Sequence, residues 1–110
     1  MSAQRQKGSS FERLIADYLA QFFPGTDRRP MGGAKDKGDI NVPGTPFTVE
    51  VKNVARMALA QWVKEAEVEA ANADLPFGIV VHKRAGKGAP NQQYVTMTLE
   101  TFVGIVTWPR

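Results

Sequence analysis

Residues 47–52 read FTVEVK, a stretch in which apolar and polar side chains alternate as they do along a β-strand. Because side chains two positions apart on a strand share a face, Glu50 and Lys52 point to one side while Val49 and Val51 point to the other. The two valines are suited to burial. The opposite face of the predicted strand then carries a carboxylate beside an amine.

A second acidic residue, Asp39, precedes this strand and opens a short apolar run at residues 39–42. If that run pairs with residues 47–52 as a hairpin, through the turn PGTP between them, Asp39 lies near Glu50. Two carboxylates and a lysine at one end of a hairpin form a divalent-metal site with a cation beside it. Such a site suits phosphodiester hydrolysis, because the metal neutralises phosphate oxygens and lowers the pKa of a water, while Lys52 orients that water or stabilises developing charge.

A Glu-x-Lys pair on a strand also occurs as a solvated ion pair that contributes little energy, so the pair alone does not decide between the two interpretations.

The composition limits which nucleophiles and metals a catalytic site in this chain can use. The chain has no cysteine and a single histidine, His82, which excludes a cysteine nucleophile and disfavours a zinc hydrolase. Any metal site must therefore be rich in carboxylates, which favours Mg²⁺ or Mn²⁺.

The length of 110 residues predicts a single domain, residues 1–110, with one core. The chain has no apolar run long enough to span a membrane, and its polar start, Met1–Lys7, does not fit a signal peptide. We therefore expect the protein to act in the cytoplasm. The net charge of +3 permits a polyanionic partner.

Periodicity and turn signals predict the remaining elements. A flexible arm at residues 1–8 precedes a helix that starts with the capping box Ser9-x-x-Glu12 and ends at Pro24. The segments that follow are a strand at 26–31, the hairpin 39–42 and 47–52, a helix at 57–73, a buried strand at 77–81, a strand at 93–97 and a closing helix at 98–106. The order α-β-β-β-α-β-β-α predicts an α/β domain with a mixed central sheet flanked by helices.

Charged residues are unevenly distributed along the chain. Acidic residues crowd the predicted helix at 57–73, which gives the molecule a sided surface. A charge distribution of this kind also occurs where the charged residues serve only solubility. The basic residues near the elements that bear the acidic pair are candidates for phosphate contacts: Lys7, Arg13, Arg28, Arg29, Lys35 and Lys37, with a second group, Lys83, Arg84 and Lys87, in a later loop.

Three segments in this order resemble the PD-(D/E)XK nuclease superfamily and, within it, the archaeal-type Holliday junction resolvases, small relatives of which occur in bacteriophages. They are KGSSFER at residues 7–13, GDI at 38–40 and VEVK at 49–52. The likeness spans roughly residues 5–83. The superfamily's name has a proline before the first aspartate, whereas in this sequence Gly38 precedes Asp39.

The resemblance implies a restriction-endonuclease-like core and assigns roles by position. Asp39 and Glu50 would be metal ligands together with the backbone carbonyl of Val51, and Lys52 would assist the attacking water. Glu12 would complete the site through a water or a second metal, although a Ser-x-x-Glu start also serves as a helix cap alone. The expected cofactor is Mg²⁺, for which Mn²⁺ would substitute.

These features predict a metal-dependent, structure-selective DNA endonuclease, in first place a Holliday junction resolvase that acts as a homodimer on junction or other branched DNA. Another nuclease of the superfamily acting on flaps, ends or duplex DNA is the alternative within the same class. A catalytically silent DNA-binding module and an unrelated small α/β protein are the alternatives outside it. No nucleotide cofactor is expected, because the sequence around Lys87 lacks the full P-loop pattern.

Overall fold

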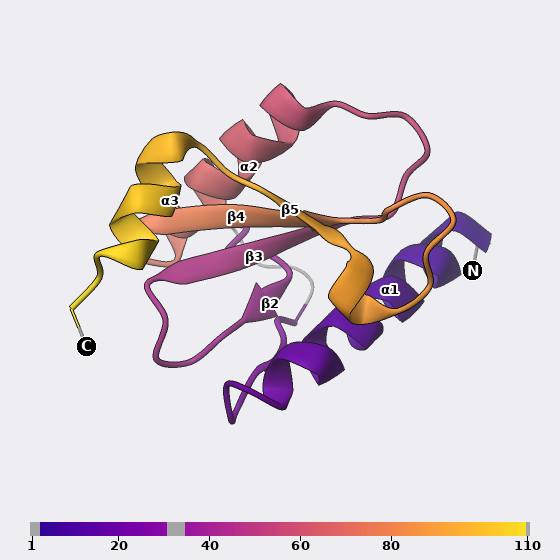
Figure 1. Cartoon of the computed structure of the whole chain (residues 1–110), viewed down its shortest axis with the longest axis horizontal. Helices are drawn as coiled ribbons and strands as arrows, with labels where there is room; N and C mark the ends of the chain where they lie inside the picture. Colours follow the sequence, from indigo (N-terminus) through magenta and orange to yellow (C-terminus); the bar gives the residue numbers. More distant parts are fainter. Residues whose placement is uncertain (1–2, 31–34, 110) are drawn as a thin grey trace.

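The computed structural model describes residues 3–30 and 35–109, which form one domain (Figure 1). Within this part of the chain the order of elements is the predicted one, with one short 3₁₀ turn (η1) added before the last strand. The elements are α1 (Ala3–Ala20), β1 (Asp27–Arg28), β2 (Ile40–Asn41), β3 (Phe47–Lys52), α2 (Leu59–Asn72), β4 (Phe77–His82), η1 (Pro90–Gln92), β5 (Tyr94–Thr96) and α3 (Leu99–Val106).

The strands form one mixed sheet in the order β1-β2-β3-β4-β5. β3 and β4 are parallel, and the other neighbouring strands are antiparallel. A parallel pair needs a crossover, and α2 supplies it between β3 and β4. The predicted α/β class with a mixed sheet flanked by helices is therefore confirmed, and so is the predicted hairpin of β2 and β3.

α1 and α2 cover opposite faces of the sheet (Figure 1). α1 packs on the face that carries Val49 and Val51, which are 0% and 9% exposed, as the alternation predicts. α2 packs on the other face through Trp62, over Val80. The second face is the one to which Glu50 and Lys52 belong, so their side chains lie between β3 and α2.

α2 approaches β4 unusually closely at Gly78. A Cβ placed on Gly78 would lie 2.0 Å from the backbone oxygen of Ala66, so only glycine fits there. This close contact brings the α2 side chains down onto the sheet and toward Glu50. In the part of the chain that the structure describes, no helix combines the length and the hydropathy needed to cross a bilayer.

The start of α1 differs from the prediction. The helix begins at Ala3, so Ser9 and Glu12 lie inside it, and the predicted capping box is wrong. Residues 3–8, expected as part of a flexible arm, are helical, because residues 3–7 (AQRQK) are good helix formers. Glu12 is therefore free for a role other than capping.

Candidate active site

The hairpin of β2 and β3 brings Asp39 to Glu50. Ile40 pairs with Val49, so the residue before Ile40 lies next to the residue after Val49. The backbone of Asp39 donates to the Val49 carbonyl oxygen at 2.9 Å, and its Oδ2 accepts from the Val51 N–H at 2.7 Å. Both the backbone and the carboxylate of Asp39 are thus fixed against β3.

Gly38 explains the departure from the proline of the superfamily's name. Its φ is +94°, which proline cannot adopt, and a Cβ there would lie 2.6 Å from Oγ1 of Thr48. That hydroxyl donates to the carbonyl oxygen of Lys37 at 2.6 Å and holds the loop against β3. A left-handed glycine is what turns the chain so that the next residue, Asp39, faces Glu50.

The Glu50 side chain is buried, and Lys52 is an ion-pair partner for only one of its two oxygens, Oε2. Burial raises its pKa to about 10, and the hydrogen bond and charge of Asp39 and the charge of Glu69 act in the same direction, against the lowering effect of Lys52. Among the described residues, Oε1 of Glu50 has no hydrogen-bond partner. A buried carboxylate with a spare oxygen and a second carboxylate beside it is a donor set for a divalent cation.

Lys52 lies next to Glu50 as a cation. Its Nζ is 3.6 Å from Oε2 of Glu50 and 3.4 Å from Oε1 of Glu65. Burial alone lowers the pKa of Lys52, but the charges of Glu50, Glu65 and Asp39 outweigh burial and raise it. Lys52 is therefore protonated at neutral pH and acts by its charge and its N–H groups, not as a general base.

Two glutamates of α2, Glu65 and Glu69, reach this cluster, and sequence reasoning missed both. Glu69 is 5% exposed, and burial together with the charge of Asp36 raises its pKa to about 8. The charge pattern of the sequence places the acidic residues of this helix on the surface, whereas Glu69 is buried. The helical period contained the signal, because Glu69 falls on the same buried stripe as Trp62 and Ala66.

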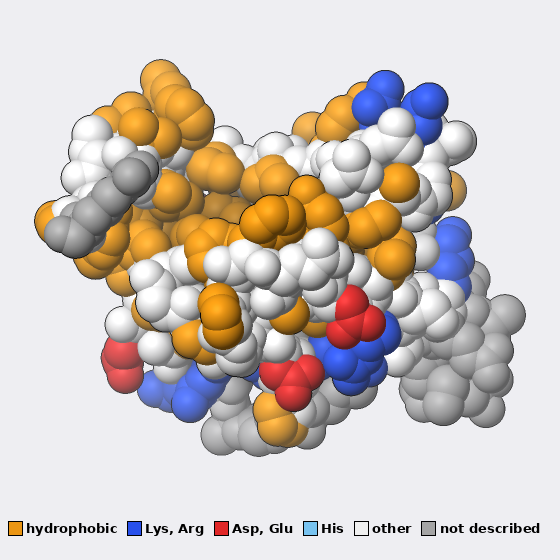
Figure 2. Space-filling view, turned by 60° about the horizontal axis from the view of Figure 1, so that its bottom comes forward, with side chains coloured by type: hydrophobic (Ala, Val, Ile, Leu, Met, Phe, Trp, Pro, Cys, Tyr) orange, Lys and Arg blue, Asp and Glu red, His pale blue; other side chains and the backbone are white. Residues whose placement is uncertain are grey.

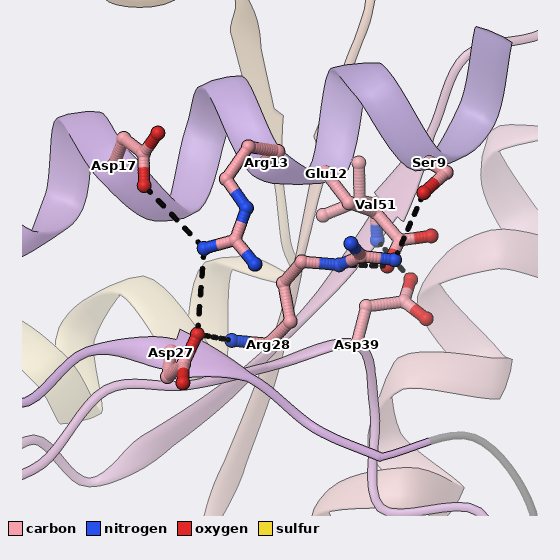
Figure 3. Close-up of polar contacts among 8 residues, drawn as sticks. All are labelled: Ser9, Glu12, Arg13, Asp17, Asp27, Arg28, Asp39 and Val51. Atoms are coloured by element: carbon pink, nitrogen blue, oxygen red, sulfur yellow. Dashed lines mark hydrogen bonds and ion pairs between the residues drawn. The ribbon is translucent and has the colours of Figure 1, made fainter. Parts of the chain in front are cut away.

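Glu12 approaches Asp39 from α1 (Figure 3). Its Oε1 lies 3.5 Å from Nε of Arg28, and Nη2 of Arg28 donates to Oγ of Ser9 at 3.1 Å. Burial and the charge of Asp39 raise the pKa of Glu12, while Arg28 lowers it. α1, β1 and β2 thus place Glu12, Arg28 and Asp39 side by side.

The predicted phosphate-binding residues fall into two groups. Arg28 and Arg29 are half-buried, and Arg29 contacts Asn41 and Thr48 at 3.4 and 3.5 Å, so both arginines are engaged within the fold beside the site. Lys83 is also engaged, since its Nζ donates to the carbonyl oxygens of Arg84 and Lys87. The residues with side chains open to solvent are Lys7, Lys35, Lys37 and Lys87, together with Arg13, which forms exposed ion pairs with Asp17 and Asp27.

The donor set fits a cation that retains several waters. Across residues 3–30 and 35–109, no three acidic, histidine or cysteine side chains converge to enclose a metal. The candidate protein ligands are Asp39, Glu50 and the Val51 carbonyl, and a site completed by several waters is typical of Mg²⁺. The spare oxygen of Glu50 supports this assignment.

Replacing Glu12 with glutamine tests whether its charge serves the reaction. The substitution keeps the shape and loses only a partly exposed ion pair with Arg28, so the free energy of unfolding is expected to change by less than about 1 kcal/mol. DNA cleavage is expected to fall by about tenfold or more. The matched control is Glu67→Gln, an exposed position on α2, and full activity of the Glu12 variant would show that Glu12 only holds Arg28.

A sequence model of the family described as "Phage putative PDDEXK endonuclease" matches residues 3–106. No curated protein and no solved structure matches the chain significantly. The matched span runs from α1 through α3 and contains Glu12, Asp39, Glu50 and Lys52. The chain therefore belongs to the phage PD-(D/E)XK endonuclease family, a family of nucleases.

Proposed function

We propose that this nuclease is a divalent-metal-dependent endonuclease for branched DNA and that its substrate is the four-way Holliday junction. The single observation that carries the metal-dependent chemistry is the placement of Asp39 against Glu50 with protonated Lys52 at their side. The resemblance of residues 5–83 to Holliday junction resolvases supports the choice of substrate. Its place of action is then the cytoplasm of a prokaryotic cell or of a phage-infected host.

Each residue of the candidate site has a separate role in the proposed reaction. Asp39 and Glu50, with the Val51 carbonyl, would hold Mg²⁺ or Mn²⁺, and the ion would neutralise phosphate oxygens and lower the pKa of a water. Lys52 donates hydrogen bonds to the attacked phosphate or to the water and stabilises the negative charge that develops. Glu65, 3.4 Å from Nζ of Lys52, positions that amine. Glu12 acts through a water at the edge of the site.

Exposed basic side chains near the site bind the DNA backbone. Lys35 and Lys37 immediately precede Asp39 in the chain, and Lys7 and Arg13 lie on the helix that bears Glu12. Contacts of this kind read the path of the phosphates and not the bases. Arg28 and Arg29 act on the DNA indirectly, by holding Glu12 and the β2 segment in place.

A cleavage panel tests the substrate. Four-way junction, flap and duplex DNA of matched sequence are incubated with the protein in Mg²⁺, in Mn²⁺ and in EDTA. Paired, symmetric nicks in the junction that disappear in EDTA are the expected result. Equal cleavage of all three substrates would contradict the junction assignment, and cleavage of none would favour a silent DNA-binding module.

The proposed homodimer has a candidate interface on β5 and α3. Several large apolar side chains there are about half exposed or more, which is unusual for an isolated domain: Val95, Leu99, Phe102, Val103 and Val106. Figure 2 shows hydrophobic side chains gathered at the end of the molecule formed by the C-terminal segment, around a hollow. A second copy is the proposed occupant, because a junction offers two equivalent strands and β5 is the last strand of the sheet, which a two-fold axis can pair with itself.

Light scattering tests this interface. The wild-type mass is expected near twice 12.1 kDa, and that of the double variant Phe102→Glu/Val106→Glu at 12.1 kDa, since two carboxylates would be buried at the interface. Both positions are more than half exposed in a single copy, so the variant should remain folded. Val68→Glu, equally exposed but on α2, is the control. A wild-type monomer on junction DNA would contradict the homodimer.

A further inference from the structure

One row of side chains leads away from Lys52 across the sheet. Lys52 of β3 is the register partner of His82 of β4, and His82 is the partner of Tyr94 of β5. Register partners share a face, so all three lie on the side of the sheet that α2 covers. Tyr94 is two strand spacings from Lys52, roughly 10 Å. This distance is short enough for one DNA strand to contact both.

Tyr94 forms part of a pocket of about 410 Å³, here called the Tyr94 pocket. Its walls combine apolar side chains, Val54 and Met57, with the cationic side chains of Lys7 and Arg84. Val54, Met57 and Tyr94 are each about half exposed. Figure 1 shows the start of α1, the α2-preceding loop and the β4–β5 loop at the same end of the sheet. The mixture of apolar surface and positive charge fits a nucleotide, which has both a flat base and a phosphate.

The floor of the pocket is held rigidly from beneath. The Tyr94 ring packs against His82 at 5.8 Å between centroids, and His82 packs against buried Trp62 at 5.5 Å. Nε2 of His82 is also within 2.7 Å of Oγ1 of Thr96, which fixes the imidazole. A ring supported in this way loses little conformational entropy when a ligand stacks on it.

Arg84 is held over the same ring. Its guanidinium lies 5.3 Å from the Tyr94 centroid, and its backbone N–H donates to Oε1 of Gln93 at 2.7 Å. The amide of Gln93 donates in turn to the carbonyl oxygens of Lys87 and Ala89 at 3.0 and 2.8 Å, which ties the β4–β5 loop together. Tyrosine rings and arginine planes are the two surfaces on which proteins stack unpaired bases.

We propose that the Tyr94 pocket binds one unpaired nucleotide of the substrate strand, with its base stacked on the Arg84 guanidinium that the Tyr94 ring supports and its phosphate beside Lys7. This inference rests on the proposed nuclease function and adds a requirement on its substrate. A base within a duplex presents only its edges, so a ring in a concave pocket reaches only a base that has left the stack. The enzyme thereby selects DNA in which a nucleotide beside the phosphate facing Lys52 can leave the stack, as a nucleotide at a branch point can.

Binding without divalent metal tests the pocket apart from catalysis. Fluorescence anisotropy in EDTA compares a short labelled single strand with a duplex of the same length. Tyr94→Ala is expected to weaken single-strand binding about tenfold, the loss of one base stack, and to leave duplex binding unchanged. Tyr94→Phe keeps the ring and should bind as the wild type does. Phe22→Ala removes an exposed aromatic ring in the turn after α1 and is the control.

A change in the DNA makes the test independent of how the variant folds. Single abasic sites are introduced at successive positions of the oligonucleotide, and wild-type affinity is expected to fall at one position relative to the bound end. That position dependence should vanish with Tyr94→Ala. The pocket assignment would be overturned if Tyr94→Ala lost affinity equally for single-stranded and duplex DNA. It would also be overturned if no abasic site changed the affinity of the wild type.

The two proposals can fail separately. If the wild type cleaves DNA in Mg²⁺ but Tyr94→Ala binds single strands normally, the nuclease function stands and the pocket assignment falls. If Tyr94 governs single-strand binding but no substrate is cleaved, the pocket stands and the proposed catalytic function falls.

Discussion

Asp39→Asn is expected to reduce cleavage of junction DNA by about 10²- to 10³-fold or more, the scale of a lost charge-stabilising group at the reacting centre. The asparagine can keep the fold. Its amide oxygen can still accept from the Val51 N–H, a bond of 2.7 Å in the wild type, while its NH₂ faces Glu50. What the variant loses is a negative charge that a divalent cation needs.

DNA affinity measured in EDTA should be unchanged in Asp39→Asn, because binding rests on exposed cations such as Lys35 and Lys37. The control is Asp74→Asn, the same chemical change at an exposed turn after α2. Full cleavage activity in Asp39→Asn, or equal losses in both variants, would remove Asp39 from the active site.

Glu50→Gln is expected to inactivate the enzyme and at the same time to stabilise the metal-free protein by about 1–3 kcal/mol at neutral pH. The buried Glu50 carboxylate lies against Asp39 with one oxygen unsatisfied among the described residues. Glutamine has nearly the same shape, carries no charge and can donate to Asp39. Chemical denaturation in EDTA measures the gain, with Glu67→Gln as the exposed control on α2.

The pH dependence follows from the same cluster. The pKa of Glu50 in the fold is raised to about 10 from its ordinary value of 4.5, so between those values the folded protein binds more protons than the unfolded chain. The contribution of Glu50 to the stability of the metal-free wild type is therefore fully present below pH 4.5 and is lost as pH rises toward about 10. Glu69, with a pKa raised to about 8, adds to the same trend.

Thermal melting across that pH range checks the sign. The melting temperature of the metal-free wild type should fall as pH rises, Glu50→Gln should flatten the fall, and Mg²⁺ should raise the wild-type curve most at high pH. A wild-type stability that increases with pH, or a Glu50→Gln variant less stable than the wild type, would show that Glu50 already has a satisfactory partner in the fold.

Local sequence patterns were enough for the sheet and for the acidic pair. The alternation in residues 47–52 gave the strand and its two faces, and the hairpin spacing placed Asp39 near Glu50, as the register confirms. These features depend on neighbours in sequence, where the period of two and the turn leave few alternatives. The helix order followed from the apolar stripes in the same way.

Features set by tertiary contacts were not predicted. Glu69 reaches Glu50 only because Gly78 lets α2 lie directly on β4, a contact between distant parts of the chain. Arg28 of β1 forms an ion pair with Glu12 of α1, so the guanidinium of Arg28 has a partner within the fold. The start of α1 was mispredicted for a different reason. The Ser9-x-x-Glu12 pattern matches a capping box, but the helix begins at Ala3 and contains both residues.

A crystal soaked with Mn²⁺ tests the central claim, that Asp39 and Glu50 hold the catalytic cation, most directly. Anomalous diffraction is predicted to show an ion bonded to carboxylate oxygens of both residues at roughly 2.0–2.2 Å, with the Val51 carbonyl among its ligands. The same soak of Asp39→Asn crystals should show that peak weakened or lost. An ion bound elsewhere, or no anomalous peak between Asp39 and Glu50 in the wild type, would contradict the assignment.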